Sequence, residues 1–181
     1  GKPLTAYEVA ELAYRIERVD LGIAGGRQDQ YAATFGGFNF IEFQPGATIV
    51  NPLRVPTNAL RELEYRLILC YLKQTRSSAA IIERQRASYV AGKRSVVRAL
   101  DRLKAHTLEM KRALLLGDID GFGGLLHEAW LAKKNLDAGI STGPVDVLYD
   151  KARRAGALGG KMPGAGGGGY FLLLCKADKK H

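Results

Sequence analysis

Three segments of the sequence combine glycines with hydroxyl or charged residues in ways that suit phosphate chemistry. The first, GIAGGRQDQY at residues 22–31, carries Asp29 close to Arg27. Its glycines let the backbone approach a ligand, and Asp29 falls in the first turn of a predicted helix. The positive end of a helix favours an ionised carboxylate, which can accept or orient a hydroxyl proton. Acidic residues are also common in first helical turns without catalysis, so both interpretations stay open here.

A second segment, KQTRSSAAII at residues 73–82, places Arg76, Ser77 and Ser78 where an apolar strand gives way to a helix. Helix-start N–H groups, hydroxyls and a guanidinium together suit an anion or a phosphate. A capping serine beside a solvated arginine would give the same letters, and for this motif alone capping is favoured. Taken with the two glycine-containing segments, it shifts the balance toward phosphate chemistry.

The third segment, GKMPGAGGGGYFLLLC at residues 160–175, places five glycines in a window of six residues before an apolar run. Glycine costs about 0.5–1 kcal/mol in a regular element, so this density needs a purpose. Backbone N–H groups that converge on a phosphate are one explanation, and a flexible hinge is another. Composition alone leaves both open. The window consists of Gly164, Ala165, Gly166, Gly167, Gly168 and Gly169.

Known glycine motifs do not fit this loop. Gly164, Gly166 and Gly169 match G-x-G-x-x-G, but a dinucleotide fingerprint needs a strand before the loop and a helix after it. The sequence predicts the reverse, a helix before the loop and a strand after it. No Ser or Thr follows a Gly-Lys pair, which excludes a Walker A loop. A protein-kinase glycine loop lies near the start of its domain, whereas this loop lies at the end of the chain.

Hydrolase and metal chemistry are also disfavoured. GISTG at residues 139–143 fits the nucleophile-elbow pattern by letters, but a helix rather than a strand is predicted to enter it. HEAWL at residues 127–131 lacks the second histidine of a zinc-protease helix. Cys70 and Cys175 lie in apolar runs, which predicts buried, reduced thiols. We therefore expect no zinc site built by this chain.

The order of the predicted elements indicates the fold class. Thr5 and Glu8 form a capping-box pattern at the start of a helix over residues 4–18. The runs at 38–43 and 47–53 are predicted to pair as strands around a QPGA turn. Beyond them we expect a third, buried strand, then helices, and a final strand after the glycine loop. These later elements are predicted at about 66–73, 79–90, 96–114, 122–136, 143–156 and 170–175. Strands and helices that mix without strict alternation predict an α+β fold.

The composition bounds the function classes. The 181 residues are 46% hydrophobic and 25% charged, which is ordinary for a globular protein. A net charge of +9 favours anionic partners, but the basic residues are scattered over predicted helices, often beside acidic ones, so nucleic acid is a minority hypothesis. No apolar run is long enough for a bilayer and no secretory signature is present, so we expect a cytoplasmic protein. The sequence begins at GKPLT without Met, which suggests a fragment.

Taken in order, GIAGGRQDQYAATFGGFNFIEF, TRSSAAII and GALGGKMPGAGGGGYFLLL resemble the C-terminal part of the GHMP kinase superfamily, most closely the D-glycero-D-manno-heptose 7-phosphate kinases. The resemblance implies the end of a ribosomal-S5-like N-terminal domain in residues 1–57 and a ferredoxin-like C-terminal domain in residues 58–181. It also implies transfer of the ATP γ-phosphoryl group to the anomeric hydroxyl of a heptose 7-phosphate, which gives the 1,7-bisphosphate.

The same resemblance assigns roles to the residues picked out above. Asp29 matches the catalytic base, or orienter, of the acceptor hydroxyl. Three neighbours of Asp29 would line the acceptor sugar, and two residues of the second segment would contact substrate or sugar phosphate. The glycine window 164–169 matches the loop beside the nucleotide phosphates and the acceptor. The neighbours are Gly25, Gly26 and Gln28, and the contacts in the second segment are Arg76 and Ser77.

The resemblance also marks what is missing. The resemblance implies a sugar phosphate and ATP as small-molecule partners. It places the ATP loop and the Mg²⁺ ligands upstream of this chain. The 181 residues alone are therefore predicted to be inactive. Three alternatives stay open: a kinase for another small sugar of the fucose or galactose type, a basic nucleic-acid-binding module, and a catalytically silent regulatory relative. The acceptor and the oligomeric state are not readable from these residues.

Overall fold

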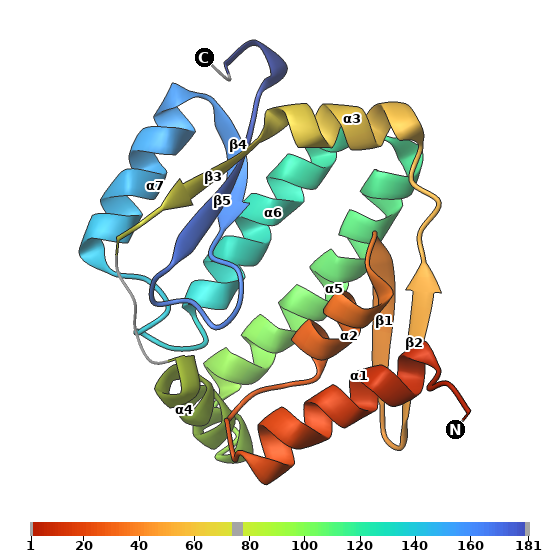
Figure 1. Cartoon of the computed structure of the whole chain (residues 1–181). Helices are drawn as coiled ribbons and strands as arrows, with labels where there is room; N and C mark the ends of the chain where they lie inside the picture. The colour runs from red at the N-terminus through yellow and green to blue at the C-terminus, as the bar shows by residue number, and fades with distance from the viewer. Residues whose placement is uncertain (1, 74–77, 180–181) are drawn as a thin grey trace. The chain divides into compact units, whose positions relative to one another are not determined.

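The structure is a computed structural model that describes residues 2–73 and 78–179 (Figure 1). The chain divides into two compact units, Gly1–Arg54 and Val55–His181. Both units combine helices with antiparallel strands, so the predicted α+β class is confirmed. Within the described residues, no helix is long and apolar enough to cross a bilayer.

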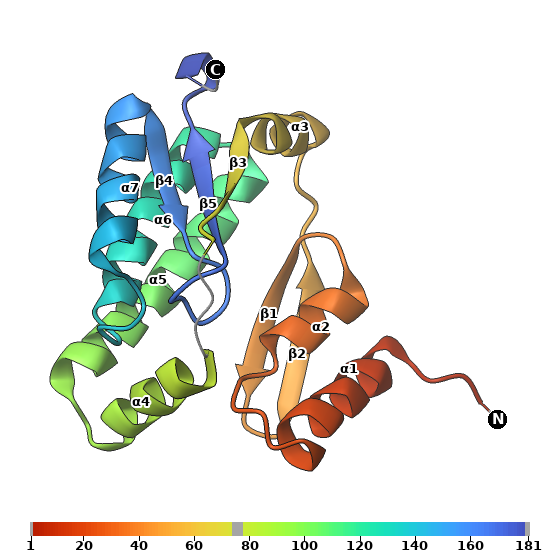
Figure 2. The same ribbon diagram turned by 60° about the vertical axis from the view of Figure 1, so that its left-hand side comes forward.

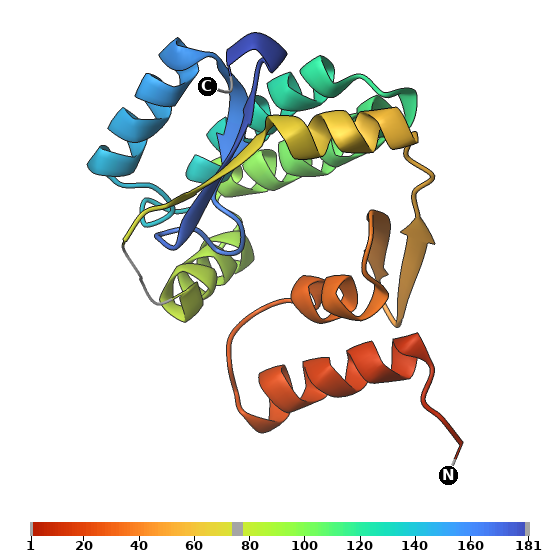
Figure 3. The same ribbon diagram turned by 45° about the horizontal axis from the view of Figure 1, so that its top comes forward.

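The first unit begins with a helix whose start the sequence predicts correctly. α1 (Ala6–Tyr14) carries the capping box: Thr5 Oγ1 accepts from the Glu8 N–H at 3.2 Å, and Glu8 Oε2 accepts from the Thr5 N–H at 2.7 Å. The winding then changes to a π-helical segment, η1 (Arg15–Asp20). After a loop comes α2 (Gln28–Phe35), which lies beside α1 (Figure 3). The predicted helix 4–18 is therefore present but ends in a different helical form.

The predicted hairpin is confirmed. β1 (Asn39–Gln44) pairs antiparallel with β2 (Ala47–Pro52), and Gln44 lies opposite Ala47 at the turn. A cluster of buried hydrophobic residues in this unit ties α1, α2 and β2 together; its members are Ala10, Tyr31 and Val50.

The second unit packs helices on a three-stranded sheet. Its helices are α3 (Thr57–Arg66), α4 (Ser78–Val90), α5 (Arg94–Leu116), α6 (Ile119–Lys134), α7 (Gly143–Ala155) and a short 3-10 helix, η2 (Ala177–Lys179). Its strands are β3 (Leu67–Tyr71), β4 (Ala157–Lys161) and β5 (Tyr170–Cys175). β5 lies between β3 and β4 and pairs antiparallel with both (Figure 2). α5 and α6 run side by side (Figure 1), and α6 packs on β4.

Both ends of α7 follow the signals in the sequence. Pro144 lies in the first turn, where its missing N–H is tolerated. Gly156 follows the helix with φ 113°, and its N–H donates to the carbonyl groups of Ala152 and Arg153. The direction of the chain into β4 is set by this cap.

The prediction that a helix directly precedes the glycine loop is wrong, because β4 lies between α7 and the loop. The loop therefore joins two antiparallel strands. A Cβ on Gly159 would come within 2.7 Å of the His127 backbone nitrogen, and one on Gly160 within 2.6 Å of the Leu172 carbonyl oxygen. The two glycines in β4 thus let the backbones of α6 and β5 approach the strand closely. Because glycine is rare in strands, they also explain why residue propensities do not predict a strand here. The exclusion of a dinucleotide site still holds, since a strand and not a helix follows the loop.

The predicted burial of the third strand is also wrong. β3 is at an edge of the sheet, and Leu69 and Tyr71 are 57% and 56% exposed. The alternate residues Ile68 and Cys70 pack against the core of the second unit. A continuous apolar run is typical of a strand buried on both faces, but here one face of the edge strand stays open.

We expect the stability of the second unit to depend on pH through His127. Its Nδ1 lies 2.7 Å from the hydroxyl of Tyr149, and burial raises the pKa of Tyr149 to about 12, so the phenol stays protonated and donates a hydrogen bond to Nδ1. Burial, and after it the charge of Arg153, lowers the pKa of His127. The unfolded chain then binds a proton more readily than the folded chain, and the free energy of unfolding falls as the pH drops through about 6.5.

Urea denaturation at pH 7.5 and pH 5.5 measures this loss. In His127→Gln the difference between the two pH values should be smaller than in the unchanged chain, because the titrating ring is gone. An equal difference in both chains would show that His127 has no part in it.

Candidate functional site

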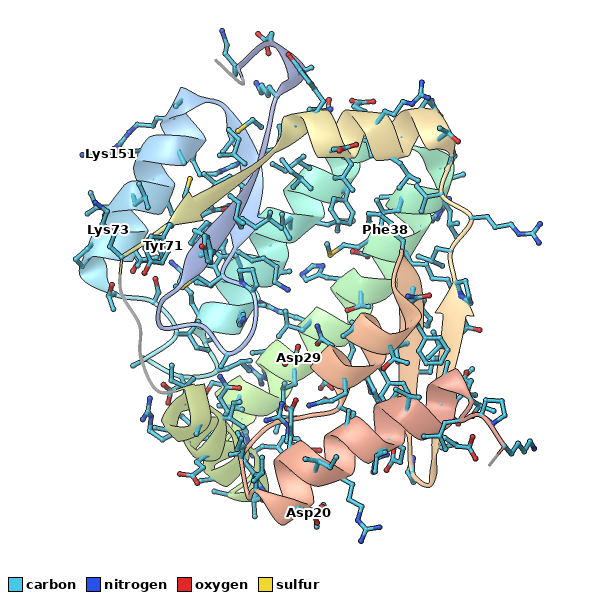
Figure 4. All side chains as sticks on the ribbon, viewed as in Figure 1. Asp20, Asp29, Phe38, Tyr71, Lys73 and Lys151 are labelled. Atoms are coloured by element: carbon cyan, nitrogen blue, oxygen red, sulfur yellow. The ribbon has the colours of Figure 1, made fainter. Side chains whose placement is uncertain are left out.

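The candidate catalytic carboxylate lies where the sequence predicts it. Asp29 is in the first turn of α2, and its side chain is 76% exposed (Figure 4). Arg27 is not its partner: the Arg27 guanidinium pairs with Glu11 at 2.7 Å and lies 4.3 Å from the centroid of the Tyr14 ring. The cation that faces Asp29 is Arg18, whose Nη2 is 4.0 Å from Asp29 Oδ2. An exposed carboxylate beside a fixed cation can accept a proton from a bound hydroxyl.

The other predicted acceptor residues share one segment with Asp29. Gly25 and Gly26 lie in the loop before α2, and Gln28 is the first residue of that helix, with an exposed side chain. Gly25 lies against the Arg18 side chain, whereas a Cβ on Gly26 would meet no atom within 4 Å. The structure therefore brings these three residues and Asp29 together in the first unit. Their contact with an acceptor stays a prediction.

The next residue of α2 links this segment to the π-helical segment. The Gln30 side chain is buried, and its Nε2 donates to Glu17 Oε2 at 2.7 Å. The Gln30 Oε1 is buried and has no hydrogen-bond partner within the described part of the chain. Gln30 and Glu17 therefore join α2 to η1, the segment that carries Arg18.

The glycine loop of the second unit has a conformation that requires glycine. Gly164, Gly166, Gly167 and Gly169 have φ of 67°, 98°, 83° and 83°, a region that side chains disfavour. Two hydrogen bonds fix the loop from either side: the Gly167 N–H donates to the Ile140 carbonyl at 3.0 Å, and Gly169 O accepts from the Leu72 N–H at 2.8 Å. Against the hinge interpretation, these contacts hold the loop to neighbouring elements.

Two further residues complete the window. Ala165 packs against the core cluster of the second unit, and Gly168 lies between two glycines of positive φ. The loop is therefore anchored inward at Ala165 while its glycines shape the backbone around it. Successive N–H groups in such a turn form the kind of concavity that binds anions.

Two lysines lie at the glycine loop, and sequence reasoning missed both. Lys133, in the last turn of α6, donates from Nζ to the carbonyl oxygens of Met162, at 3.0 Å, and Gly164. Burial, and after it the charge of Lys161, lowers the pKa of Lys133 to about 8, and burial lowers the pKa of Lys161. Neither ammonium pairs with a carboxylate within the described residues, so the loop lies beside uncompensated positive charge. A basic residue at a helix end is too common to have revealed this contact.

Replacing Lys133 with Met should loosen the glycine loop. The partly buried carbonyl group of Met162 would lose its donor, and an unsatisfied buried polar group costs about 1–3 kcal/mol, whereas water can replace the donor to the carbonyl group of exposed Gly164. We expect amide exchange over residues 162–169 to become faster and the free energy of unfolding to fall. Lys134→Met is the matched control, because the neighbouring Lys134 pairs with Asp146 at 3.1 Å instead of with the loop. Equal effects in the two variants would contradict the role given to Lys133.

The described residues do not include the predicted substrate contacts of the second segment, and they contain no cluster of metal ligands. Arg76 and Ser77 lie outside the described residues, so their predicted substrate contact stays a prediction. Among the residues that are described, no group of three or more His, Cys, Asp or Glu side chains could hold a metal ion.

Family models match both ends of the chain. The model described as "GHMP kinases N terminal domain" matches residues 1–37, and "GHMP kinases C terminal" matches residues 110–181. The chain is 41% identical to the D-glycero-alpha-D-manno-heptose 7-phosphate kinase of Campylobacter jejuni, over 99% of this chain and 52% of that protein. It is 30% identical to the L-fucokinase/L-fucose-1-P guanylyltransferase of Bacteroides fragilis, over 93% of this chain and 18% of that protein.

Solved structures show the same likeness. A D-glycero-D-manno-heptose 1-phosphate kinase from Bacteroides thetaiotaomicron matches with a TM-score of 0.70 and 35% identity, over 99% of this chain and 47% of that one. The mevalonate kinase of L. major matches with a TM-score of 0.75 and 24% identity, over 98% and 52%, which shows a shared fold. The chain spans about half the length of the heptose phosphate kinases that it matches.

Proposed function

Because this chain belongs to the GHMP kinase superfamily, we propose that it forms the acceptor-binding and phosphate-side part of an ATP-dependent sugar-phosphate kinase. The observation that carries the proposal is the exposed Asp29 at the start of α2, in a chain that is 41% identical to a heptose phosphate kinase over nearly all its residues. We take residues 1–57 and 58–181 as the parts of the two family domains. Location in the cytoplasm stays a prediction.

The proposed acceptor is a heptose phosphate. Asp29 accepts the proton of the attacking hydroxyl, the oxygen of that hydroxyl forms a bond to the γ-phosphorus of ATP, and the bond from that phosphorus to ADP breaks. Gly25, Gly26 and Gln28 line the sugar. Phosphoryl transfer depends on positioning and on charge neutralisation, which a single carboxylate can serve on the acceptor side.

The glycine window 164–169 takes the phosphate-side role. Its backbone N–H groups suit an anion, apart from that of Gly167, which donates to Ile140 O, and Lys133 and Lys161 add positive charge close by. Mg²⁺, when bound, neutralises phosphate charge in such reactions. We propose that its ligands lie outside this chain.

A chimera tests the proposal, with residues 1–181 in place of the matched half of the Campylobacter jejuni kinase. We expect ADP release with D-glycero-D-manno-heptose 7-phosphate, and a much weaker response to fucose or galactose. Heptose 1-phosphate is assayed in parallel, because the two heptose kinases differ in the phosphate position that their names give. A folded chimera that turns over no heptose phosphate, beside an active parent enzyme, would overturn the proposal.

The 181-residue chain by itself should show no ATP turnover. None of its assigned residues holds the triphosphate as a whole, so the γ-phosphoryl group would not be positioned for transfer. The assay is ADP release with the same acceptors, with the chimera as positive control. Measurable turnover by the lone chain would show that it holds ATP without a further part.

A further inference from the structure

We propose that Arg18 is a positioning residue that fixes the acceptor loop and holds the Asp29 carboxylate; the inference rests on the proposed function. The Arg18 side chain is 12% exposed although it belongs to a surface helix. Arginine presents its N–H donors in a rigid planar fork, so a single side chain can bind several acceptors in fixed directions. Here the fork lies between the loop before α2 and the first turn of α2 itself.

One edge of the guanidinium binds the loop. Arg18 Nε donates to Gly26 O at 3.2 Å, and Nη1 lies 3.4 Å from Ile23 O and 3.5 Å from Ala24 O. Three carbonyl groups of one short segment thus converge on one cation. A hydrogen bond to a charged donor is worth about twice a neutral one, so this cluster can hold an otherwise glycine-rich loop in one conformation.

The other edge faces carboxylates. Arg18 Nη2 lies 3.4 Å from Glu17 Oε2 and 4.0 Å from Asp29 Oδ2. Glu17 also accepts from Gln30 Nε2, so its carboxylate is held from the side of α2 as well. Arg18 therefore connects the position of the loop to the position of Asp29, while most of the Asp29 side chain stays open to a ligand.

Gly25 is explained by the same contact. A Cβ on Gly25 would come within 2.7 Å of Arg18 Nη1 and 2.8 Å of Nε, so the guanidinium lies directly against this backbone. Gly26 differs, since a Cβ there would meet nothing within 4 Å. A side chain at position 25 would thus displace the Arg18 guanidinium, whereas one at position 26 would displace no atom, and we assign the open space at Gly26 to the acceptor.

The π-helical winding of η1 presents Arg18 to the loop. The Leu21 N–H donates to Ile16 O and the Ile23 N–H to Glu17 O, at 2.9 and 3.0 Å, which are wider steps than those of an α-helix. Single π-turns occur often at functional sites. Here the wide turn carries Arg18 between its own helix end and the segment 23–26.

Kinetics of the chimera test the catalytic consequence. We expect Arg18→Met to lower kcat/KM for the heptose phosphate about 100-fold, because small misplacements of reacting groups cost that much, with KM for ATP unchanged. Arg18→Lys should be impaired like Arg18→Met, since an ammonium group cannot bind three carbonyl groups and a carboxylate at the same time. Guanidinium ion at millimolar concentration should partly restore Arg18→Ala and leave Arg18→Lys unimproved. Full activity of Arg18→Lys, or no rescue of Arg18→Ala, would overturn the role of the fork.

Amide exchange on the 181-residue chain separates this inference from the proposed function. In Arg18→Met and in Gly25→Ala, exchange over residues 22–27 should become about tenfold faster or more, whereas Gly26→Ala should leave it unchanged. If the unaltered chimera is inactive but exchange responds in this way, the proposed function fails and the positioning role stands. Unchanged exchange in Arg18→Met would overturn the positioning role whatever the kinetics show.

Discussion

Asp29→Asn in the chimera should lower kcat by about 10²–10⁴-fold, the range that positioned proton transfer contributes. Asparagine has the same shape but cannot take up the proton of the acceptor hydroxyl. KM for the heptose phosphate should change little, because the loop that we propose to line the sugar keeps its conformation. The side chain is 76% exposed, so the free energy of unfolding should be nearly unaltered. Steady-state ADP release and urea denaturation of the same preparation measure both quantities.

Asp20→Asn is the matched control for this experiment. Asp20 belongs to the same unit, its side chain is 53% exposed, and its ion-pair contact is with Arg15 at 4.0 Å (Figure 4). A substitution that removes one surface charge without touching the acceptor segment should leave kcat within about twofold. If Asp29→Asn behaves like Asp20→Asn, the carboxylate is not the base, and the chain fits a catalytically silent relative instead.

Gly123→Ala should strongly destabilise the second unit, although alanine is the better helix former. Gly123 lies in α6 where the helix meets β4, and a Cβ would come within 2.6 Å of Leu158 Cβ and 3.2 Å of Leu174 Cδ2. The helix and the strand must separate to admit it, and overpacking of this kind costs about 1–3 kcal/mol. Urea denaturation followed by the fluorescence of Trp130, which is fully buried in the same unit, measures the loss.

The adjacent glycine supplies the control. A Cβ on Gly124 would meet no atom within 4 Å, and the residue lies on the exposed side of α6. Gly124→Ala should therefore raise the free energy of unfolding by about 0.5–1 kcal/mol, the ordinary helix-propensity gain. Opposite signs at two consecutive residues would establish the close contact. A gain at both positions would show that α6 and β4 are not packed as described.

Local signals in the sequence correctly predict where some helices and strands begin or end. The capping box at Thr5 and Glu8, the turn between the hairpin strands, and the glycine after α7 each act within a few residues, so they can be recognised without the fold. Asp29 belongs to this class, because its place in the first turn of α2 follows from the chain immediately around it.

Features that depend on a distant partner are not predicted. β4 is missed because Gly159 looks like a turn residue until α6 is placed against it, and β3 looks buried until its edge position is known. Lys133 reaches carbonyl groups about thirty residues further along the chain. Arg18 is close in sequence to the loop that it binds, but the direction of its side chain depends on the π-helical winding of η1, which no residue pattern predicts.

The winding of η1 also bears on which changes in chain length this protein tolerates. Loops normally accept insertions and deletions. In Arg15–Asp20, removal of one residue would return the turn to α-helical winding and rotate the following loop by about 100° relative to Arg18. We therefore expect relatives that use the proposed acceptor site to keep the number of residues between the capping box and Asp29 constant, whereas we expect the hairpin turn after β1 to vary in length.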